Sequence, residues 1–404
     1  MGNNSQVTVA AWLKVLFYLL FFVQSQVKGQ FIEPIINVTY IEDGVAKGAV
    51  CLDGSPGAYH FGQGFEDGID NWVIYLPGGA WCDSKDDCLI RSNDSYSGNT
   101  RHAIPKPLFG FLSEDKSLNS DFYNWNKVYI RYCDGASFLA DVEAADPVTK
   151  LYQRGRRIFG SVLEELITTK GMSNAVNALL TGNSAGGLAT ILNCDRFRSF
   201  LPDACRVKCV SDSGFFIRGK DLPGAYDRAI DYFGRVVNYH KLAKYLPESC
   251  TRRLAPELCF FAENVVDDIE APLYLLNSNF DRYQISRLVV PNPPTNEGWA
   301  DCTKNFSSLK RCTADQLHLM KDFQNVFLKT LEGLNDNPSR GLFIISCFIH
   351  DISPRVQHAP NWQGTTILQN KAVLQIVGDW YFERSNVRFI DNQHSYPTNC
   401  SLAK

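Results

Sequence analysis

Short apolar runs separated by longer amphipathic stretches make up most of the chain. Residues 154–166 place their apolar side chains three and four positions apart, which is the spacing of a helix with one buried face. Runs of apolar, β-branched and aromatic residues predict buried strands at 72–76, 128–132, 175–180, 207–211, 272–276 and 342–347. Strands that alternate with helices predict an α/β fold, with a mainly parallel sheet flanked by helices. A sheet of this kind carries its ligand site at the carboxyl ends of its strands.

Residues 221–268 differ from the rest of the chain because they are charged and helical in pattern. We expect this stretch to form a helical insertion or lid that borders the substrate groove. No Pro/Ser-rich linker, repeat or low-complexity tract divides the chain after its N-terminal segment. The sequence therefore predicts a single domain over residues 30–404, and its hydrophobic content of 45% is sufficient for a large core.

The N-terminal segment has the pattern of a secretory signal. Residues 15–23 are entirely apolar, and Lys14 is the only charged residue before Lys28. The apolar run is too short to span a bilayer, and the small residues Ser25 and Gly29 follow it. We predict a cleaved signal peptide over residues 1–29, with an uncleaved anchor as the alternative. No later stretch approaches the length of a membrane span, so a secreted, extracellular protein without stable membrane insertion is expected.

The charge of the chain narrows the class of partner. The 404 residues carry a formal net charge of −3, and no basic stripe is interleaved with aromatic residues. Nucleic-acid-binding domains normally show such a basic footprint. The sequence therefore argues against nucleic acid as a partner.

Thirteen cysteines predict an oxidised framework of the kind found in secreted proteins. Cys82 and Cys88 are near enough in sequence to close a small loop, and the odd total leaves at least one thiol free or paired outside the chain. Cys205 and Cys209 form a C-x3-C without a second half, so no zinc site is predicted. Sequons for N-glycosylation fit the same secretory route, at Asn37, Asn93, Asn305 and Asn399.

Residues 182–187 read Gly-Asn-Ser-Ala-Gly-Gly and join the predicted strand 175–180 to an apolar helix-like run at 188–192. A G-x-S-x-G string between a strand and a helix is typical of a nucleophile elbow. The glycines allow a tight turn that exposes the serine, and the following helix directs its amides at negative charge beside it. We therefore predict Ser184 as a hydrolase nucleophile.

A serine hydroxyl needs a base, and in α/β-hydrolases the acid and then the base follow the nucleophile along the chain. His350 ends the apolar run 343–349, so it emerges where a strand-end loop delivers a base. His358 lies in a proline-flanked loop and His318 in a charged helical stretch. We favour His350 as the base and keep His358 as the alternative.

The acid that orients the base is also expected after a strand. Asp281 follows the run 273–280, and Asp212 follows the run 207–211. We favour Asp281, because Asp212 stands next to Ser-Gly, where an aspartate commonly serves a turn.

Acyl transfer also requires donors for the oxyanion that forms at the ester carbonyl. Residues 77–81 read Pro-Gly-Gly-Ala-Trp directly after the strand 72–76 and resemble the glycine-rich oxyanion loop of esterases. We predict an oxyanion hole formed by the amides of Gly79, Ala80 and Ala185. A plain turn is the alternative.

Taken together, these pieces resemble the plant pectin acetylesterase family, which also includes the animal Notum carboxylesterases. The resemblance runs in order from about Cys51 to the C-terminus and rests on several long strings: CLDGSPGAYH at 51–60, WC at 81–82, FYNWN at 122–126, RYCDGASF at 131–138, GNSAGGLA at 182–189, VKCVSD at 207–212, SCFIH at 346–350 and GDWYF at 378–382.

The resemblance implies a secreted α/β-hydrolase that removes acetyl groups from O-acetylated galacturonan in the plant cell wall. The family's serine, aspartate and histidine match Ser184, Asp281 and His350. No metal or organic cofactor is implied, and we expect a monomer. The alternatives are deacetylation of another polysaccharide such as xylan or mannan, a Notum-like deacylation, and a weakly active wall glycoprotein.

This chain departs from the plant family pattern at four places. Asn183 stands where a cysteine is usual, and residues 77–80 read Pro-Gly-Gly-Ala in place of Glu or Gln followed by three glycines. Asp351 and Ile352 replace Cys-Gln after the histidine, and cysteines usual near positions 392 and 398 are missing. The missing cysteines suggest a lost or rewired disulfide near the histidine. Asp351 is expected to influence the pKa of the adjacent base.

Overall fold

The computed structural model describes residues 31–397, apart from 221, 223–224, 291–297, 305, 353–370, 386–387 and 393. Residues 35–404 form one compact unit. The predicted signal peptide lies outside the described residues and stays a prediction. The predicted single domain also stays a prediction, and everything below concerns the compact unit.

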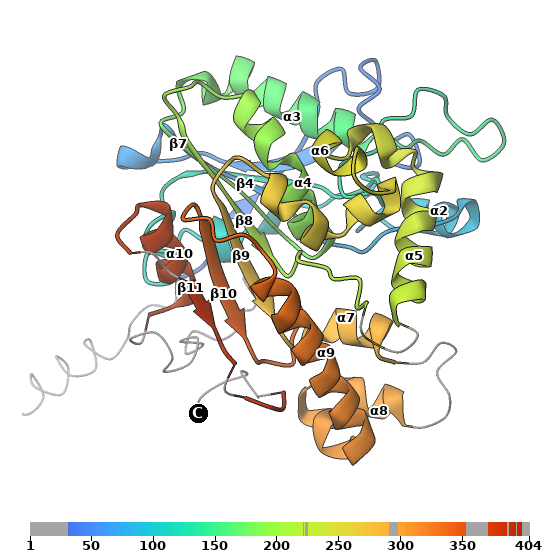
Figure 1. The fold of residues 1–404 in the computed structure, drawn as a ribbon. Helices are drawn as coiled ribbons and strands as arrows, with labels where there is room; N and C mark the ends of the chain where they lie inside the picture. The colour runs from blue at the N-terminus through green and yellow to red at the C-terminus, as the bar shows by residue number, and fades with distance from the viewer. Residues whose placement is uncertain are drawn as a thin grey trace, which may run out of the picture. The chain divides into compact units, whose positions relative to one another are not determined.

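A nine-stranded sheet runs through this unit in the order β11-β10-β9-β8-β7-β4-β6-β3-β2 (Figure 1). All pairings from β11 to β6 are parallel, whereas β3 pairs antiparallel with β6 and with β2. The strands are β2 Val38–Tyr40, β3 Ala58–Gly62, β4 Asn71–Leu76, β6 Asn126–Ile130, β7 Asn177–Asn183, β8 Arg206–Asp212, β9 Leu273–Ser278, β10 Arg340–Ile345 and β11 Arg388–Ile390. A separate antiparallel pair joins β1 Ile35–Ile36 to β5 Lys106–Pro107. The α/β fold with a mainly parallel sheet is therefore confirmed.

Each of the six predicted strands overlaps an observed one, from β4 to β10 along the chain. The strands that the pattern did not predict lie at the two edges of the sheet. The edge strands β2 and β11 have only three residues each, which is too short for a periodic pattern to be recognised in the sequence. The strand β3 contains a histidine and a glycine, so its composition is not typical of a strand.

Alternate residues of the central strands enter two separate cores. In β4, Trp72, Ile74 and Leu76 pack into the larger core, whereas Val73 and Tyr75 pack into the core on the opposite face. Side chains of a strand point alternately to the two faces of its sheet. Because helices and loops cover both faces, the strand is apolar at nearly every position and lacks a polar-apolar alternation.

The helices lie on both faces of the sheet (Figure 1). Contacts place α4 against β7 and β8, and Val373, Ile376 and Val377 of α10 belong to the smaller core. The helices are α2 Lys85–Ser92, α3 Gly155–Thr169, α4 Ala185–Ser199, α5 Ala225–Tyr239, α6 Glu248–Thr251, α7 Arg282–Leu288, α8 Trp299–Thr303, α9 Ala314–Glu332 and α10 Val373–Tyr381. The predicted helix at 154–166 corresponds to α3.

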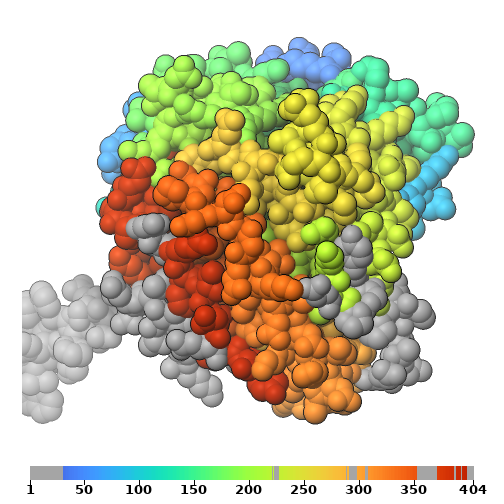
Figure 2. Space-filling view, in the orientation of Figure 1, coloured from blue at the N-terminus to red at the C-terminus, as the bar shows by residue number. Residues whose placement is uncertain are grey.

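The stretch predicted as a helical insertion is helical. It contains α5, α6 and short 3-10 turns at Leu242–Tyr245, Pro256–Phe260, Ala262–Asn264 and Val266–Asp268. Figure 2 shows the yellow surface of these later residues beside the yellow-green surface of α5, and the turn at Pro256–Phe260 is in contact with that helix. Among the described residues, no helix is both long and apolar enough to cross a membrane.

Most of the described disulfides close short local loops, and Cys51–Cys133 joins residues 82 positions apart. The described pairs are Cys51–Cys133, Cys82–Cys88, Cys194–Cys209, Cys250–Cys259 and Cys302–Cys312. Cys347, three residues before His350, is disulfide-bonded as well. Cys205 is free and buried, in agreement with the unpaired thiol that the odd count required. The predicted local loop between Cys82 and Cys88 is confirmed.

Candidate active site

Ser184 occupies a strained turn between β7 and α4. Its backbone has φ 55° and ψ −124°, a conformation that residues with a side chain rarely adopt. The flanking glycines are required by close packing, because an added Cβ would lie 2.3 Å from the Leu76 carbonyl oxygen at Gly182 and 1.9 Å from it at Gly186. The strand β4 therefore passes so close to the turn that only glycine fits on either side of the serine. Strain of this kind is typical of a nucleophile elbow.

A chain of hydrogen bonds links the serine to a histidine and an aspartate. The Ser184 hydroxyl donates to His350 Nε2 at 2.7 Å. His350 Nδ1 donates to the Asp281 carboxylate, with distances of 3.0 Å to Oδ1 and 2.9 Å to Oδ2. This arrangement assigns the proton of the neutral imidazole to Nδ1 and leaves Nε2 to accept the serine proton. The structure thus brings together the three residues that the sequence analysis chose, from the ends of β7, β9 and the segment after β10.

Asp281 is held in place by the first turn of α7. It is fully buried and caps α7, where its Oδ1 accepts a hydrogen bond from the Gln284 amide at 2.9 Å. A capping carboxylate at a helix N-terminus is stabilised by the unpaired amides of the first turn. The carboxylate is therefore oriented before any substrate binds.

The charges around His350 favour its protonated form. Burial lowers the pKa of His350, but the negative charges of Asp281 and Asp351 outweigh it and raise the pKa to about 9. The Asp351 Oδ1 lies 3.6 Å from Nε2, on the side of the ring that faces the serine. Asp351 thus acts on the base, as its position next to the histidine suggested.

Asp212, the alternative acid, supports the loop that follows the histidine. Its carboxylate accepts hydrogen bonds from the Ile352 amide at 2.9 and 3.0 Å and from the Ser213 hydroxyl at 2.9 Å. The Ser213 hydroxyl in turn accepts from the Asp351 amide at 3.0 Å. Asp212 is fully buried, so it holds residues 351–352 in place from the end of β8.

The other histidines take different places. The alternative base His358 lies outside the described residues. The imidazole of His318 is mostly exposed on α9, 3.9 Å from Asp322, and the imidazole of His394 bonds to Asp391 at 2.8 Å.

The predicted oxyanion loop lies directly against the serine. A Cβ added to Gly78 would lie 2.6 Å from the Ser184 Cβ. Gly79 and Ala80 have φ of 154° and 55°, and their carbonyls accept hydrogen bonds from Arg91 at 2.8 Å and from the Tyr132 hydroxyl at 2.7 Å. Within the described part of the chain, the amides of Gly79 and Ala80 have no hydrogen-bond partner. Two free donors beside a serine suit the stabilisation of an oxyanion.

Asn183 ties this loop to the serine turn. Its side-chain oxygen accepts from the Gly78 amide at 2.9 Å and from the Tyr75 hydroxyl at 2.8 Å. The role of Asn183 was not foreseen from the sequence, which flagged the residue only as a departure from the family pattern. In the sequence, only the position of Asn183 next to the nucleophile pointed to a role in the site.

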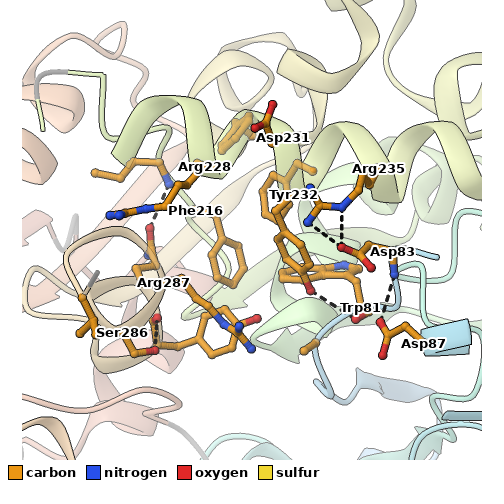
Figure 3. Close-up of a pocket in the computed structure, with 18 of the residues that line it drawn as sticks. Trp81, Asp83, Asp87, Phe216, Arg228, Asp231, Tyr232, Arg235, Ser286 and Arg287 are labelled. Carbon is orange, nitrogen blue, oxygen red and sulfur yellow. Dashed lines mark hydrogen bonds and ion pairs between the residues drawn. The ribbon is translucent and has the colours of Figure 1, made fainter. Parts of the chain in front are cut away.

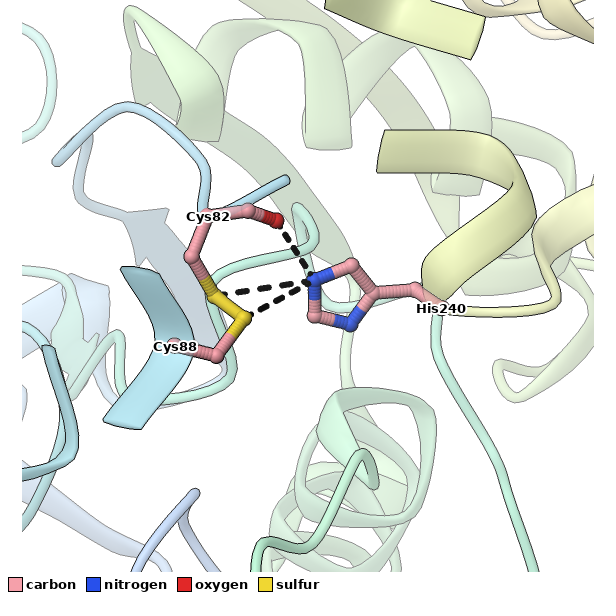
Figure 4. Close-up of side chains that lie close together, drawn as sticks. All are labelled: Cys82, Cys88 and His240. Carbon is pink, nitrogen blue, oxygen red and sulfur yellow. Dashed lines mark hydrogen bonds between the residues drawn. A yellow bond between two sulfur atoms is a disulfide. The ribbon is translucent and has the colours of Figure 1, made fainter. Parts of the chain in front are cut away.

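A cluster of two cysteines and a histidine lies beyond the same loop. Cys82 and Cys88 lie near His240 within 4.8 Å, a grouping that would suit a metal ion (Figure 4). The two sulfurs are joined in a disulfide, however, and His240 Nε2 donates to the Cys82 carbonyl at 2.8 Å. Metal ligation by cysteine requires thiolates. The cluster therefore stabilises the segment after the oxyanion loop through the Cys82–Cys88 disulfide and the His240 hydrogen bond.

A cavity of about 830 Å³ lies next to the oxyanion loop and Tyr283, and neither Ser184 nor His350 is among the residues that line it. Tyr283 stacks on His350 with ring centroids 5.1 Å apart, and Phe216 contacts the imidazole at 6.3 Å. The aromatic and charged side chains that line the cavity are shown in Figure 3, and they come from the oxyanion loop, α2, α5, α7 and the segment after β8. Because α5 forms one wall, the insertion 221–268 does border the cavity.

Comparisons with known proteins agree with this site. A family model described as pectinacetylesterase matches residues 32–402. Pectin acetylesterase 11 of Arabidopsis thaliana is 41% identical over 382 residues, covering 94% of this chain and 95% of the relative. Pectin acetylesterase 7 of the same plant is 42% identical over 360 residues, covering 88% and 90%.

The fold is also similar to a solved structure. The crystal structure of the Wnt deacylase Notum from Drosophila superimposes with a TM-score of 0.73 at 21% identity, covering 90% of this chain and 98% of that one. The described unit therefore has an α/β-hydrolase-like fold.

Proposed function

Because the chain belongs to the pectinacetylesterase family, we propose that it hydrolyses the acetyl esters of pectin with Ser184, His350 and Asp281 as its catalytic residues. The chain is a carboxylic ester hydrolase, and a polysaccharide is its substrate. The observation that carries the proposal is the continuous chain of hydrogen bonds from the Ser184 hydroxyl through His350 to Asp281, at 2.7 and 2.9 Å. Its disulfides support a secreted enzyme, and its family supports action in the cell wall.

In the first half of the proposed cycle, His350 Nε2 takes the proton of the Ser184 hydroxyl while the serine oxygen attacks the acetyl carbonyl carbon. Asp281 keeps the Nδ1 proton in place and stabilises the imidazolium that forms. The tetrahedral oxyanion accepts hydrogen bonds from the amides of Gly79, Ala80 and Ala185. Collapse breaks the bond to the sugar oxygen, which leaves as an alcohol after receiving the proton from His350.

In the second half, water attacks the acetyl-serine with His350 again as base. The products are acetate and the regenerated serine hydroxyl. The free amides of the oxyanion loop support this route, because each donor of an oxyanion hole typically contributes about 3 kcal/mol to the transition state.

The proposal is tested by acetate release from acetylated pectin, with acetylated xylan as a neutral polysaccharide control. The purified protein is compared with Ser184→Ala, whose folding is checked by thermal melting. Release from pectin that falls at least about a thousandfold in Ser184→Ala would support the proposal. Near-normal activity of Ser184→Ala would overturn the nucleophile assignment. Release from xylan but not from pectin would overturn the substrate.

A further inference from the structure

The cavity of about 830 Å³ adjoins the candidate active site. It borders the oxyanion loop at Ala80, and its wall contains Tyr283, the ring that stacks on the imidazole. The substrate alcohol leaves from the side of Ser184 that faces His350 Nε2, since this nitrogen must return the proton. Through Ala80 and Tyr283, this cavity adjoins the region that the leaving sugar occupies.

Two arginines converge on the Tyr283 end of the cavity. The Arg287 guanidinium carbon lies 5.3 Å from the centroid of the Tyr283 ring. Burial raises the pKa of Tyr283, and the positive charges of Arg287 and Arg91 oppose that rise. Arg287 thus contacts the ring that stacks on the candidate base, and Arg91 lines the same cavity.

These arginines keep their donors available. Arg91 donates one nitrogen to the Gly79 carbonyl, whereas its Nη1 is buried without a hydrogen-bond partner. Among the described residues, Arg287 has no carboxylate within ion-pair distance. A buried guanidinium donor without a partner costs free energy unless a ligand supplies an acceptor.

The acidic residues that line the cavity are Asp83, Asp87 and Asp231. Asp83 is paired with Arg235 at 2.8 Å, an ion pair that Figure 3 shows on the side of the cavity away from Ser286 and Arg287. Asp87 accepts a hydrogen bond from the Asp83 amide at 3.2 Å, and Asp231 is exposed on α5. Among the described residues, neither Arg287 nor Arg91 forms an ion pair with any of these three carboxylates.

We propose that Arg287, assisted by Arg91, binds the carboxylate of the galacturonate nearest the scissile acetyl ester. This assignment rests on the proposed function. It adds that the site selects polymers whose galacturonate carboxylate is free. A guanidinium matches a carboxylate with two parallel hydrogen bonds, and its planar group stacks on an aromatic ring as Arg287 does here.

The test uses pairs of acetylated oligogalacturonides that differ only in the carboxylate, which is free in one and methyl-esterified in the other. The unmodified enzyme is expected to have a higher kcat/KM for the free acid. Arg287→Gln should lower the ratio of the two kcat/KM values about tenfold or more, mainly through KM for the free acid, because a charge-assisted hydrogen bond is lost. For Arg287→Lys, the ratio of the two kcat/KM values should lie between that of the unmodified enzyme and that of Arg287→Gln. The lysine ammonium keeps the charge but not the paired geometry.

The matched control is Arg252→Gln. Arg252 is mostly exposed beyond α6 and pairs with Glu248 at 3.6 Å. This variant should keep the free-acid to methyl-ester ratio of the unmodified enzyme. Thermal melting of each variant checks that the fold is retained.

The outcomes separate this proposal from the proposed function. If acetate is released from both oligogalacturonides with equal kcat/KM, or if Arg287→Gln leaves the ratio unchanged, the carboxylate site is wrong and the esterase assignment stands. If no acetate is released from either substrate while the protein hydrolyses a small neutral acetyl ester, the proposed substrate is wrong and the carboxylate site falls with it.

Discussion

The Asp351 Oδ1 lies 3.6 Å from Nε2 of His350, the nitrogen that accepts the hydrogen bond of Ser184. Asp351 has φ 68°, and the Ser213 hydroxyl accepts a hydrogen bond from its amide. The backbone thus directs a second carboxylate at the face of the imidazole that performs the chemistry. The base is therefore set between Asp281 on one nitrogen and Asp351 on the other.

This relationship predicts an alkaline pH dependence. His350 must be neutral to accept the serine proton, and its pKa is raised to about 9 because the charges of Asp281, Asp351 and Asp212 outweigh its burial. Activity should therefore rise with pH up to about this value. Asp351→Asn removes one negative charge, so the pKa of His350 should fall and the rising limb of kcat/KM should move by about one pH unit toward acid.

The measurement is the pH profile of kcat/KM on a neutral acetyl ester for the two proteins. Asp322→Asn, which changes a carboxylate 3.9 Å from the imidazole of His318 on α9, is the control and should not move the limb. An unmoved limb in Asp351→Asn would show that Asp351 does not act on the base.

A comparison of the two buried aspartates should distinguish their roles. Asp281→Asn removes the carboxylate that holds the imidazole proton on Nδ1, so kcat should fall about ten-thousandfold while the fold is kept. Asp212→Asn should lower thermal stability, because Asp212 holds the Ile352 amide, and its kcat should fall far less. Kinetics and thermal melting of both variants check this. A greater loss of kcat in Asp212→Asn than in Asp281→Asn would reverse the assignment.

Asn183 is predicted to position the oxyanion loop. In Asn183→Ala the Gly78 amide and the Tyr75 hydroxyl lose their acceptor. The loop amides should then be less well placed, and kcat should fall about tenfold with little change in KM, since the effect belongs to the transition state. Asn177→Ala, which removes an amide bonded to Asn71 at the opposite end of β7, is the matched control. A change in KM alone would contradict this role.

The disulfide between Cys82 and Cys88 should stabilise both the fold and the site. Replacing both cysteines with serine should lower the free energy of unfolding by about 2 kcal/mol, the loop entropy of so short a closure. Activity should fall as well, because Cys82 lies two residues after Ala80. The disulfide between Cys302 and Cys312 closes a loop of similar length, so replacing both of its cysteines with serine should lower stability without the same loss of activity. Denaturant unfolding and acetate release measure the two effects.

Local sequence determined much of the fold and three residues of the site. The apolar runs from β4 to β10 are strongly patterned, because each strand is covered on both faces and its composition reports that burial. Ser184, Asp281 and His350 could be chosen because each follows such a run, and parallel strands bring their carboxyl ends to one edge of the sheet. Gly182 and Gly186 also carry a local signal, because they complete the G-x-S-x-G string around Ser184.

Tertiary structure alone decided the rest. The bonds of Asn183 to Gly78 and Tyr75 join residues more than 100 positions apart, and the cavity brings Arg91 of α2 to the same site as Tyr283 and Arg287 of α7. No periodicity encodes such contacts, because they depend on how helices and loops pack around the sheet. The same holds for the edge strands β2 and β11, whose few residues acquire strand structure only by pairing with a neighbour already in place.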